Sequence, residues 1–261
     1  MPPLALTPGL RGPQVWRMEY GTIQEAVAET GLVVRGGFHP GAEDGLPGGA
    51  ETMVLVGNAG PAMRDAFAAA TGPGDRPGDR KDGPNPLDDW TRGVLAPVAG
   101  ALGARALYPF EGPPYFPFQR WALRTGGVHV SPIGPLIDPE FGLWHAYRGA
   151  LAFDQRLEVP DPGSHLRPCE SCAEKPCLDT CPVGAFGPRE DPEAPAPYDI
   201  PACVAHISSV DGEDCLGRGC LARCSCPVGR DYIYGADQAR FHMQRFLKAQ
   251  GGRTGASVVC L

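Results

Sequence analysis

Three short apolar runs in the first 160 residues have the length and composition of β-strands. Residues 32–36 (LVVRG) and 53–57 (MVLVG) are rich in valine and leucine and end in glycine, which suits buried strands better than helices. A last strand is expected within residues 149–159, where the sequence GALAFDQRLEV begins with small and apolar side chains. The runs predict a sheet with a hydrophobic core.

Two segments of this part of the chain have helical periodicity. Residues 22–30 begin with Thr22 and carry Glu25 three positions later, the arrangement of a capping box in which each side chain binds a free backbone N–H group at the helix start. Residues 88–104 place apolar side chains at helical spacing, and Pro97 is expected to bend this helix. Strands and helices together predict the α+β class.

The chain divides into three parts. Residues 1–160 are expected to form the α+β domain, residues 161–235 a small cysteine-rich module, and residues 236–261 a C-terminal helix and tail. The segment 160–168 (PDPGSHLRP) has the composition of a linker. Residues 236–250 predict an amphipathic helix whose apolar side packs on the body of the protein.

Composition and charge exclude several classes of protein. The chain has 261 residues, 43% of them hydrophobic, which is enough for one main core and a smaller appendage. A formal net charge of −7 disfavours binding to nucleic acid or to anionic lipid, because both reward a basic face. No apolar run reaches the roughly 18 residues of a spanning helix, and the N-terminus does not resemble a secretory signal. We therefore expect a cytoplasmic protein with no membrane or nucleic-acid partner.

The cysteines are the candidate metal ligands or redox groups of this chain. Nine of the ten lie between Cys169 and Cys226. Since cytosolic thiols are kept reduced, such density indicates metal ligation or redox chemistry rather than disulfides. The cysteines form two runs, and each run ends in the tetrapeptide CPVG, at residues 181–184 and 226–229. The module is therefore a degenerate internal repeat.

The first run has the spacing C-x2-C-x4-C-x3-C-P, which is similar to that of bacterial ferredoxins with two [4Fe–4S] clusters. In those ferredoxins three closely spaced cysteines hold one cluster, while the cysteine before proline holds the other. The same rule gives two sets of four ligands here: Cys169, Cys172, Cys177 and Cys226 for the first cluster, and Cys181, Cys203, Cys215 and Cys220 for the second.

Two cysteines lie outside these ligand sets, and one metal other than iron is an alternative. Cys224 has no counterpart in the repeat, but it stands two residues from Cys226 and is able to replace it as a ligand. Cys260 is expected to be a free thiol in the tail. Structural zinc is the alternative, because two four-cysteine sites would also use eight thiolates. The Cys-Pro pairs and the tight clustering of the ligands favour iron and sulfur.

The segment HVSPIGPLIDPEFGLWHAYRGALAF (129–153), followed by the first cysteine run and by CLARCSCPVG, resembles the epoxyqueuosine reductase family of corrinoid-dependent iron–sulfur enzymes. Reductive dehalogenases are among the relatives of this family. The resemblance covers residues 119–230. It implies a nitroreductase-like N-terminal domain that binds cobalamin and a ferredoxin-like module that passes electrons to the cobalt. Family members have two residues between the second and third cysteines of the first run, where this chain has four.

The resemblance also marks four positions as contacts of the cofactor: Gln119, Ser131, His145 and Tyr147. Gln119 stands where the family has the aspartate taken as proton donor in epoxide reduction. An amide cannot act as a general acid, so reduction of epoxyqueuosine itself is not expected. For His145 the alternative is a packed, hydrogen-bonded histidine.

Two functions remain open. One is a redox enzyme in which the clusters deliver electrons to a corrinoid for a reductive reaction, and the retained stretch from Ser131 to Phe153 favours it. The other is a non-catalytic electron carrier or a cluster-containing interaction protein, which Gln119 favours. Either one requires an electron-donor protein or a reductase as its partner.

Overall fold

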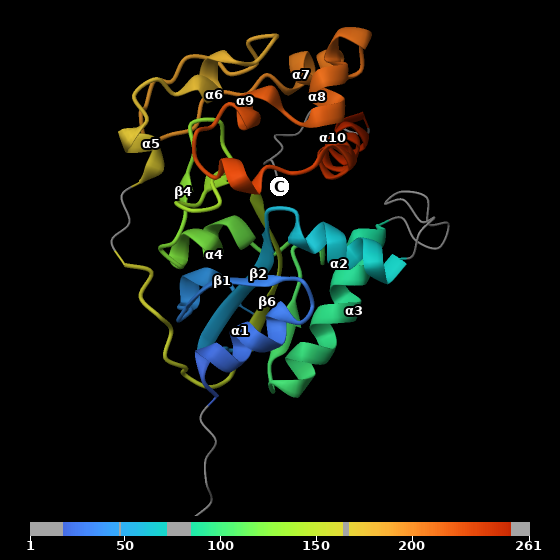
Figure 1. The fold of residues 1–261 in the computed structure, drawn as a ribbon. Helices are drawn as coiled ribbons and strands as arrows, with labels where there is room; N and C mark the ends of the chain where they lie inside the picture. The colour runs from blue at the N-terminus through green and yellow to red at the C-terminus, as the bar shows by residue number, and fades with distance from the viewer. Residues whose placement is uncertain (1–17, 47, 72–84, 164–166, 252–261) are drawn as a thin grey trace, which may run out of the picture.

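The computed structural model describes residues 18–46, 48–71, 85–163 and 167–251. In the N-terminal part the elements are α1 (Tyr20–Ala28), β1 (Val33–Phe38), η1 (Ala42–Asp44), β2 (Thr52–Ala59), α2 (Ala62–Thr71), α3 (Pro86–Ala101), β3 (Arg105–Leu107), α4 (Phe118–Arg124), β4 (His129–Val130), β5 (Leu136–Ile137) and β6 (His145–Phe153). They are followed by α5 (Pro168–Ser171), α6 (Pro176–Asp179), α7 (Ile200–Ile207), η2 (Val210–Gly212), α8 (Glu213–Arg218), α9 (Leu221–Cys224), η3 (Arg230–Tyr232) and α10 (Ala236–Gly251). The short helices α5 to α9 lie together at one end of the sheet domain, with α10 beside them (Figure 1).

A four-stranded antiparallel sheet organises the N-terminal part. Its strand order is β1-β2-β6-β3. The central strand β2 pairs with β6 along its whole length, from Thr52 opposite Phe153 to Ala59 opposite His145. All residues of β2 except the last are buried, as expected of a continuous apolar run in the middle of a sheet. The strands predicted at residues 32–36 and 53–57 are confirmed.

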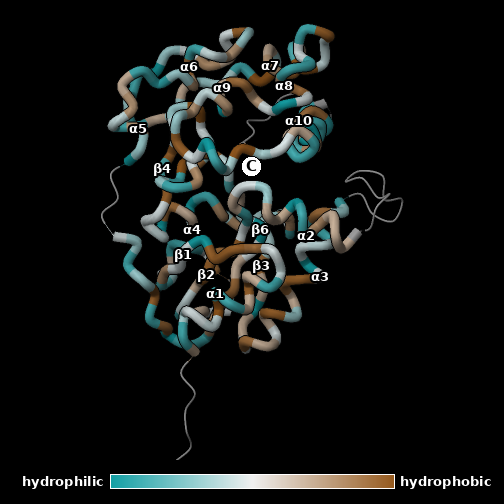
Figure 2. Tube along the Cα trace, in the orientation of Figure 1, coloured by the Kyte–Doolittle hydropathy of each residue, from teal (hydrophilic) through white to brown (hydrophobic). Residues whose placement is uncertain are grey.

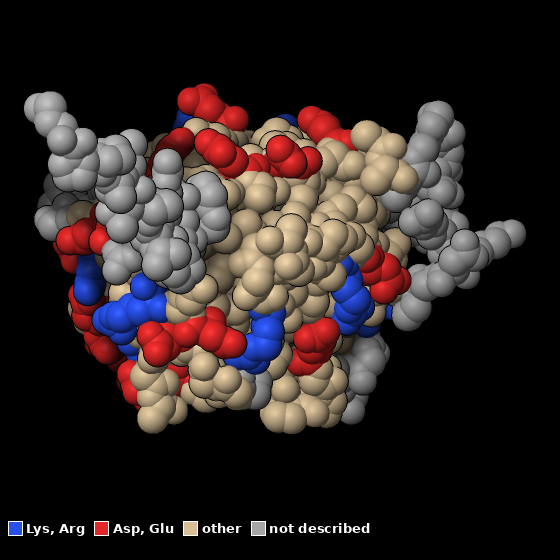
Figure 3. Space-filling model, turned by 90° about the horizontal axis from the view of Figure 1, so that it is seen from below, with Lys and Arg blue, Asp and Glu red and all other residues tan. Residues whose placement is uncertain are grey.

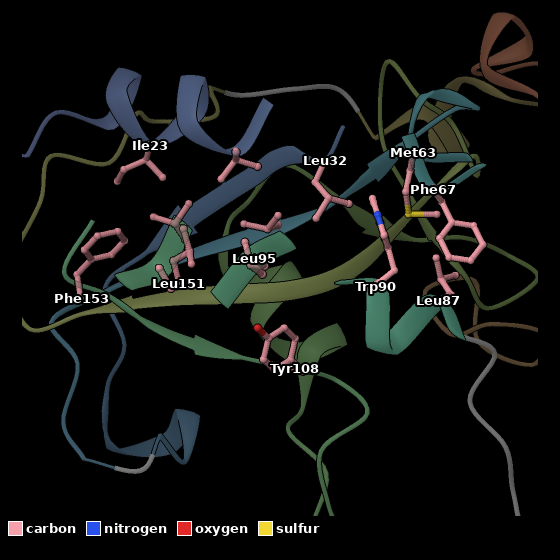
Figure 4. Close-up of a cluster of buried hydrophobic side chains, with 14 of the residues drawn as sticks. Ile23, Leu32, Met63, Phe67, Leu87, Trp90, Leu95, Tyr108, Leu151 and Phe153 are labelled. Carbon is pink, nitrogen blue, oxygen red and sulfur yellow. The ribbon is translucent and has the colours of Figure 1, made fainter. Parts of the chain in front are cut away.

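Helices cover both faces of this sheet. On one face, side chains from α1, α2 and α3, among them Ile23 and Leu95, pack against Leu151 of β6 (Figure 4). On the other face, Trp121 of α4 packs against Leu55 of β2 and donates its indole N–H to the Asp44 carbonyl oxygen at 3.0 Å. Each large side chain buried in this way contributes about 1.5–3 kcal/mol relative to an exposed one. The two cores hold β6, which carries His145 and Tyr147, in a fixed position.

The predicted helix at residues 22–30 exists, but its capping box does not. Helix α1 begins two residues earlier, its N-cap is Glu19, and no side chain caps it. Thr22 therefore lies inside the first turn, where its hydroxyl cannot serve as the N-cap acceptor. The pattern Thr-x-x-Glu is compatible with a helix interior as well as with a helix start.

The other predicted elements are present with shifted bounds. The helix expected at residues 88–104 is α3, with Pro97 inside it. The strand expected within residues 149–159 is β6, which begins earlier, at His145. The amphipathic helix predicted at residues 236–250 is α10, and its Phe241 packs against the core under α2 and α3. Part of the linker and the tail with Cys260 lie outside the described residues.

Apolar residues concentrate in the sheet and in the helices that cover it, whereas the module mixes short polar and apolar segments (Figure 2). The antiparallel sheet and the helices around it place the molecule in the α+β class. Over the described ranges, none of the helices combines the length and the hydrophobicity that crossing a membrane requires.

Candidate metal centres

Three neighbouring cysteines of the first run and one distant cysteine of the second run line one cavity of the module. They are the first predicted ligand set, Cys169, Cys172, Cys177 and Cys226. The cavity contains about 280 Å³ of space that no atom occupies, part of it open to solvent. Its other walls are mostly apolar and come from both the module and the N-terminal domain: Pro132, Ile137, Pro168, Lys175, Pro176, Pro227 and Val228.

The four-residue spacing before Cys177 is accommodated by one unusual backbone conformation. Lys175 precedes α6 with φ 42°, in the left-handed region, which non-glycine residues seldom adopt. Its ammonium group donates to the Cys172 carbonyl oxygen at 3.1 Å. The turn brings Cys177 to the same cavity as Cys172 despite the longer spacing, and it adds one positive charge to the wall.

The thiols of this first set influence one another. Burial, together with the neighbouring Cys226 and Cys172, raises the pKa of Cys169 to about 11. Burial likewise raises the pKa of Cys177 to about 11, with additional contributions from Cys226, Cys169 and Cys172. Four thiolates in so small a space repel one another unless a cationic group compensates them. Metal ions supply such compensation and bind the thiolate form.

Members of the second predicted set lie near enough to one another to influence their pKa values. Burial raises the pKa of Cys203, and Cys181 and Cys215 are close enough to raise it further. Burial raises the pKa of Cys220 to about 12, with smaller contributions from Cys203 and Cys215. Each group therefore takes one cysteine from the other run: Cys226 joins the first set and Cys181 joins the second.

Hydrogen bonds reach several of these sulfurs. The Ala185 N–H donates to Cys181 Sγ at 3.3 Å. The Leu221 N–H donates to Cys215, the N–H groups of Arg223 and Ala222 to Cys220, and the Val228 N–H to Cys226, each of which lowers the pKa of the thiol that accepts it. Such bonds stabilise thiolates and tune the reduction potential of a cluster that the thiolates hold.

Cys224 lies apart from the first cavity. Its side chain packs beside Trp144, Tyr234 and Ala239, and its Sγ is 3.9 Å from the Arg218 carbonyl oxygen. Burial raises its pKa, with a smaller contribution from Cys215, so Cys224 borders the second set rather than the first. Among the described residues, no three or more His, Cys, Asp or Glu side chains form a group that could hold a metal ion.

The four residues that the resemblance marks as cofactor contacts lie in or beside the N-terminal cores. Ser131 and His145 are buried, and His145 Nε2 is 3.0 Å from the Leu136 carbonyl oxygen. Tyr147 packs beside the α4 core, while Gln119 is half-buried on α4. None of the four lines the cysteine cavity. His145 is thus packed and hydrogen-bonded through Nε2, whereas its buried Nδ1 has no hydrogen-bond partner among the described residues.

Sequence reasoning missed an ion pair beside these residues. Arg35 of β1 and Asp138 after β5 are joined by a 2.6 Å contact between Nη2 and Oδ2, and their side chains are 5% and 14% exposed. Burial and, to a smaller extent, Arg35 lower the pKa of His145 to about 3, and Asp138 opposes both effects. Burial also raises the pKa of Tyr147. The signal in the sequence was a single arginine inside the apolar run LVVRG.

The segment 129–153 packs directly against the first cysteine set, as its position before the first run predicts. Ile137 and Leu143 belong to the same buried cluster as Cys177 and Cys226. From the module, Arg223 Nε donates to the Leu143 carbonyl oxygen at 3.0 Å. The first set therefore lies at the junction between the module and the N-terminal domain.

No protein-family model matches the chain, and no curated protein matches it either. The assignment of function consequently rests on the residues and their geometry.

Proposed function

We propose that this protein is an iron–sulfur electron-transfer protein whose module holds two [4Fe–4S] clusters. The observation that supports the proposal most strongly is the shared cavity of Cys169, Cys172, Cys177 and Cys226, which joins residues from both runs. The donor set fits the cluster, because four thiolates are its usual ligands. Bound clusters would supply reversible one-electron transfer.

The exchange of one cysteine between the two groups favours iron–sulfur clusters over zinc. In two-cluster ferredoxins the cysteine before each proline ligates the cluster of the other run. Cys226 and Cys181, the two cysteines that precede proline, are grouped in this crossed way here. Structural zinc sites are instead commonly formed by pairs of cysteines at knuckle spacing, and they do not require this exchange.

The module's own residues would protect and tune these clusters. Prolines and aliphatic side chains wall the first cavity and restrict water there. Backbone N–H groups donate to sulfurs of both sets. Because the first set lies against the N-terminal domain, electrons would pass from the second set through the first towards an acceptor on that domain. A corrinoid acceptor is the prediction of the family resemblance.

Metal analysis tests the proposal. The full chain is purified without oxygen, and iron, inorganic sulfide and zinc are measured together with the visible and electron paramagnetic resonance spectra. Two clusters require about eight iron and eight sulfide per chain. Colourless protein with stoichiometric zinc and no sulfide would refute the proposal.

The same preparation tests the corrinoid separately. A ligand that binds only the folded state raises the melting temperature, so cobalamin is titrated while the corrinoid spectrum and the thermal transition are followed. If neither changes at near-saturating cobalamin, the function reduces to electron transfer without a corrinoid, and the two-cluster proposal stands on its iron and sulfide content.

A further inference from the structure

The two copies of CPVG both end in a glycine with left-handed φ, but their surroundings differ. Their closing residues, Gly184 and Gly229, have φ of 59° and 73°. In the second copy, a methyl group on Gly229 would overlap Phe141, and one on Gly142 would overlap the Val228 carbonyl. The turn of residues 227–229, here called the covered turn, is thus closed by a loop of the N-terminal domain.

The equivalent turn beside the second set, residues 182–184, has no such cover and is here called the open turn. A methyl group added at Gly184 would meet no heavy atom of the described residues within 4 Å. Val183 is 41% exposed, although its counterpart Val228 is partly buried in an apolar cluster. The repeat therefore offers a second docking face that the described part of the chain does not use.

Charge indicates what would occupy this face. Residues 161–235 contain twelve acidic and six basic side chains, a balance of −6, whereas the whole chain has −7. The rest of the protein is nearly neutral, and on the face seen in Figure 3 acidic and basic side chains are interspersed. The negative charge of the protein is thus concentrated in the module.

Acidic side chains lie close to the open turn. Asp179 is exposed two residues before Cys181. Asp199 is also exposed, and its backbone N–H donates to the Ala185 carbonyl oxygen at 2.8 Å, next to the turn. The Asp199 carboxylate also accepts from the Ala202 N–H at the start of α7. An exposed valine with acidic residues near it is complementary to an apolar spot within a basic rim.

We propose that the open turn and the carboxylates around it are the docking site of an electron-donor protein with a basic face. This inference rests on the proposed function. One electron would leave the redox group of the donor, which is oxidised, and would reduce the cluster held by the second set. Docking at residues 182–184 places the donor beside Cys181, a proposed ligand of that cluster.

Binding to a basic redox protein tests the site. Ferricytochrome c is the probe, and its dissociation constant with the full-length protein is measured by calorimetry without oxygen at low and at high salt. Val183→Lys should weaken binding at low salt by about tenfold or more, because it places like charges opposite each other. The matched control is Leu123→Lys on α4, where the native residue is 42% exposed; its effect should stay within about twofold.

A second pair of variants separates local from net charge. Asp179→Lys should weaken binding severalfold, whereas Glu25→Lys, at an exposed position of α1, should not. The rate at which the dithionite-reduced protein reduces the haem of cytochrome c should fall together with the affinity. The rate at which a small neutral quinone oxidises the reduced protein should not change. Rapid quinone oxidation would show that the clusters of each variant remain functional.

The outcomes are distinct from those of the metal analysis. Iron and sulfide are measured in every variant first, and protein without either would refute the proposed function. If all variants contain full iron and Val183→Lys and Leu123→Lys weaken the binding of cytochrome c equally, the docking site is overturned and only an effect of net charge remains. If Val183→Lys leaves the dissociation constant for cytochrome c unchanged, the docking site is overturned as well.

Discussion

The ion pair between Arg35 and Asp138 should be one of the interactions on which the junction between the domains depends. Its Nη2–Oδ2 distance is 2.6 Å, and the two side chains are 5% and 14% exposed. Asp138 Oδ1 also accepts from the backbone N–H groups of Glu140 and Phe141, at 2.8 and 2.9 Å. The pair thus ties β1 to the loop that closes the covered turn.

Breaking this pair should be costly, because the remaining charge stays buried. Removal of one partner of a buried pair costs about 3–5 kcal/mol, out of the roughly 5–15 kcal/mol that stabilise a domain. For a chain of this size we expect Arg35→Met to lower the melting temperature by at least about 6 °C. The double variant Arg35→Met/Asp138→Asn should recover part of this loss, since no unpaired charge remains.

The assay compares melting temperatures without oxygen at one scan rate, with iron content as the check that the clusters are retained. Arg92→Met is the control, because the Arg92–Glu111 pair is half exposed and should contribute at most about 1 kcal/mol. If the two single substitutions are additive in the double variant, the ion pair is not the source of the stability. A similar loss in the control would also refute the reasoning.

Two further predictions concern the ligands and the pH dependence. Cys226→Ser should lose one cluster and about half of the iron, whereas Cys224→Ser should keep all of it, because Cys226 lines the first cavity and Cys224 does not; iron analysis showing the reverse would require new ligand sets. The pKa of His145 is lowered by burial to about 3, so its contribution to stability is complete above the unfolded-state pKa of about 6.5 and is lost as the pH falls towards 3. The free energy of unfolding, measured in urea, should fall between pH 7 and pH 5 by about 2 kcal/mol less in His145→Gln than in the wild type. If the free energy of unfolding had the same pH dependence in both proteins, His145 would not titrate in this way.

The sequence could predict the elements whose signal is local. The apolar run MVLVG identifies β2 because a strand buried on both faces needs apolar side chains at every position. The start of β6 was missed because His145, Tyr147 and Arg148 interrupt the apolar pattern. Their burial depends on contacts with other elements, such as the Arg148–Asp88 pair at 2.7 Å, which no pattern within one strand reveals.

The same distinction applies to the candidate site. The cavity shared by Cys169, Cys172, Cys177 and Cys226 could be predicted, because the spacing of each run is a local property and the ferredoxin rule exchanges the cysteine before proline between the two runs. The Arg35–Asp138 pair could not be predicted, since its members are 103 residues apart. A charged residue in an apolar run indicates that some partner exists, but only the folded chain identifies it.

The duplicated tetrapeptide shows how one local turn can serve two roles. Both closing glycines have left-handed φ values, which glycine adopts without steric cost. What differs is the contact that each copy makes. The loop of Phe141 and Gly142 presses on the turn that follows Cys226 and leaves the turn after Cys181 untouched. If the proposed clusters are bound, the loop of Phe141 and Gly142 therefore contacts the turn beside a ligand of the first cluster only, and the turn beside the second cluster is left free of this contact.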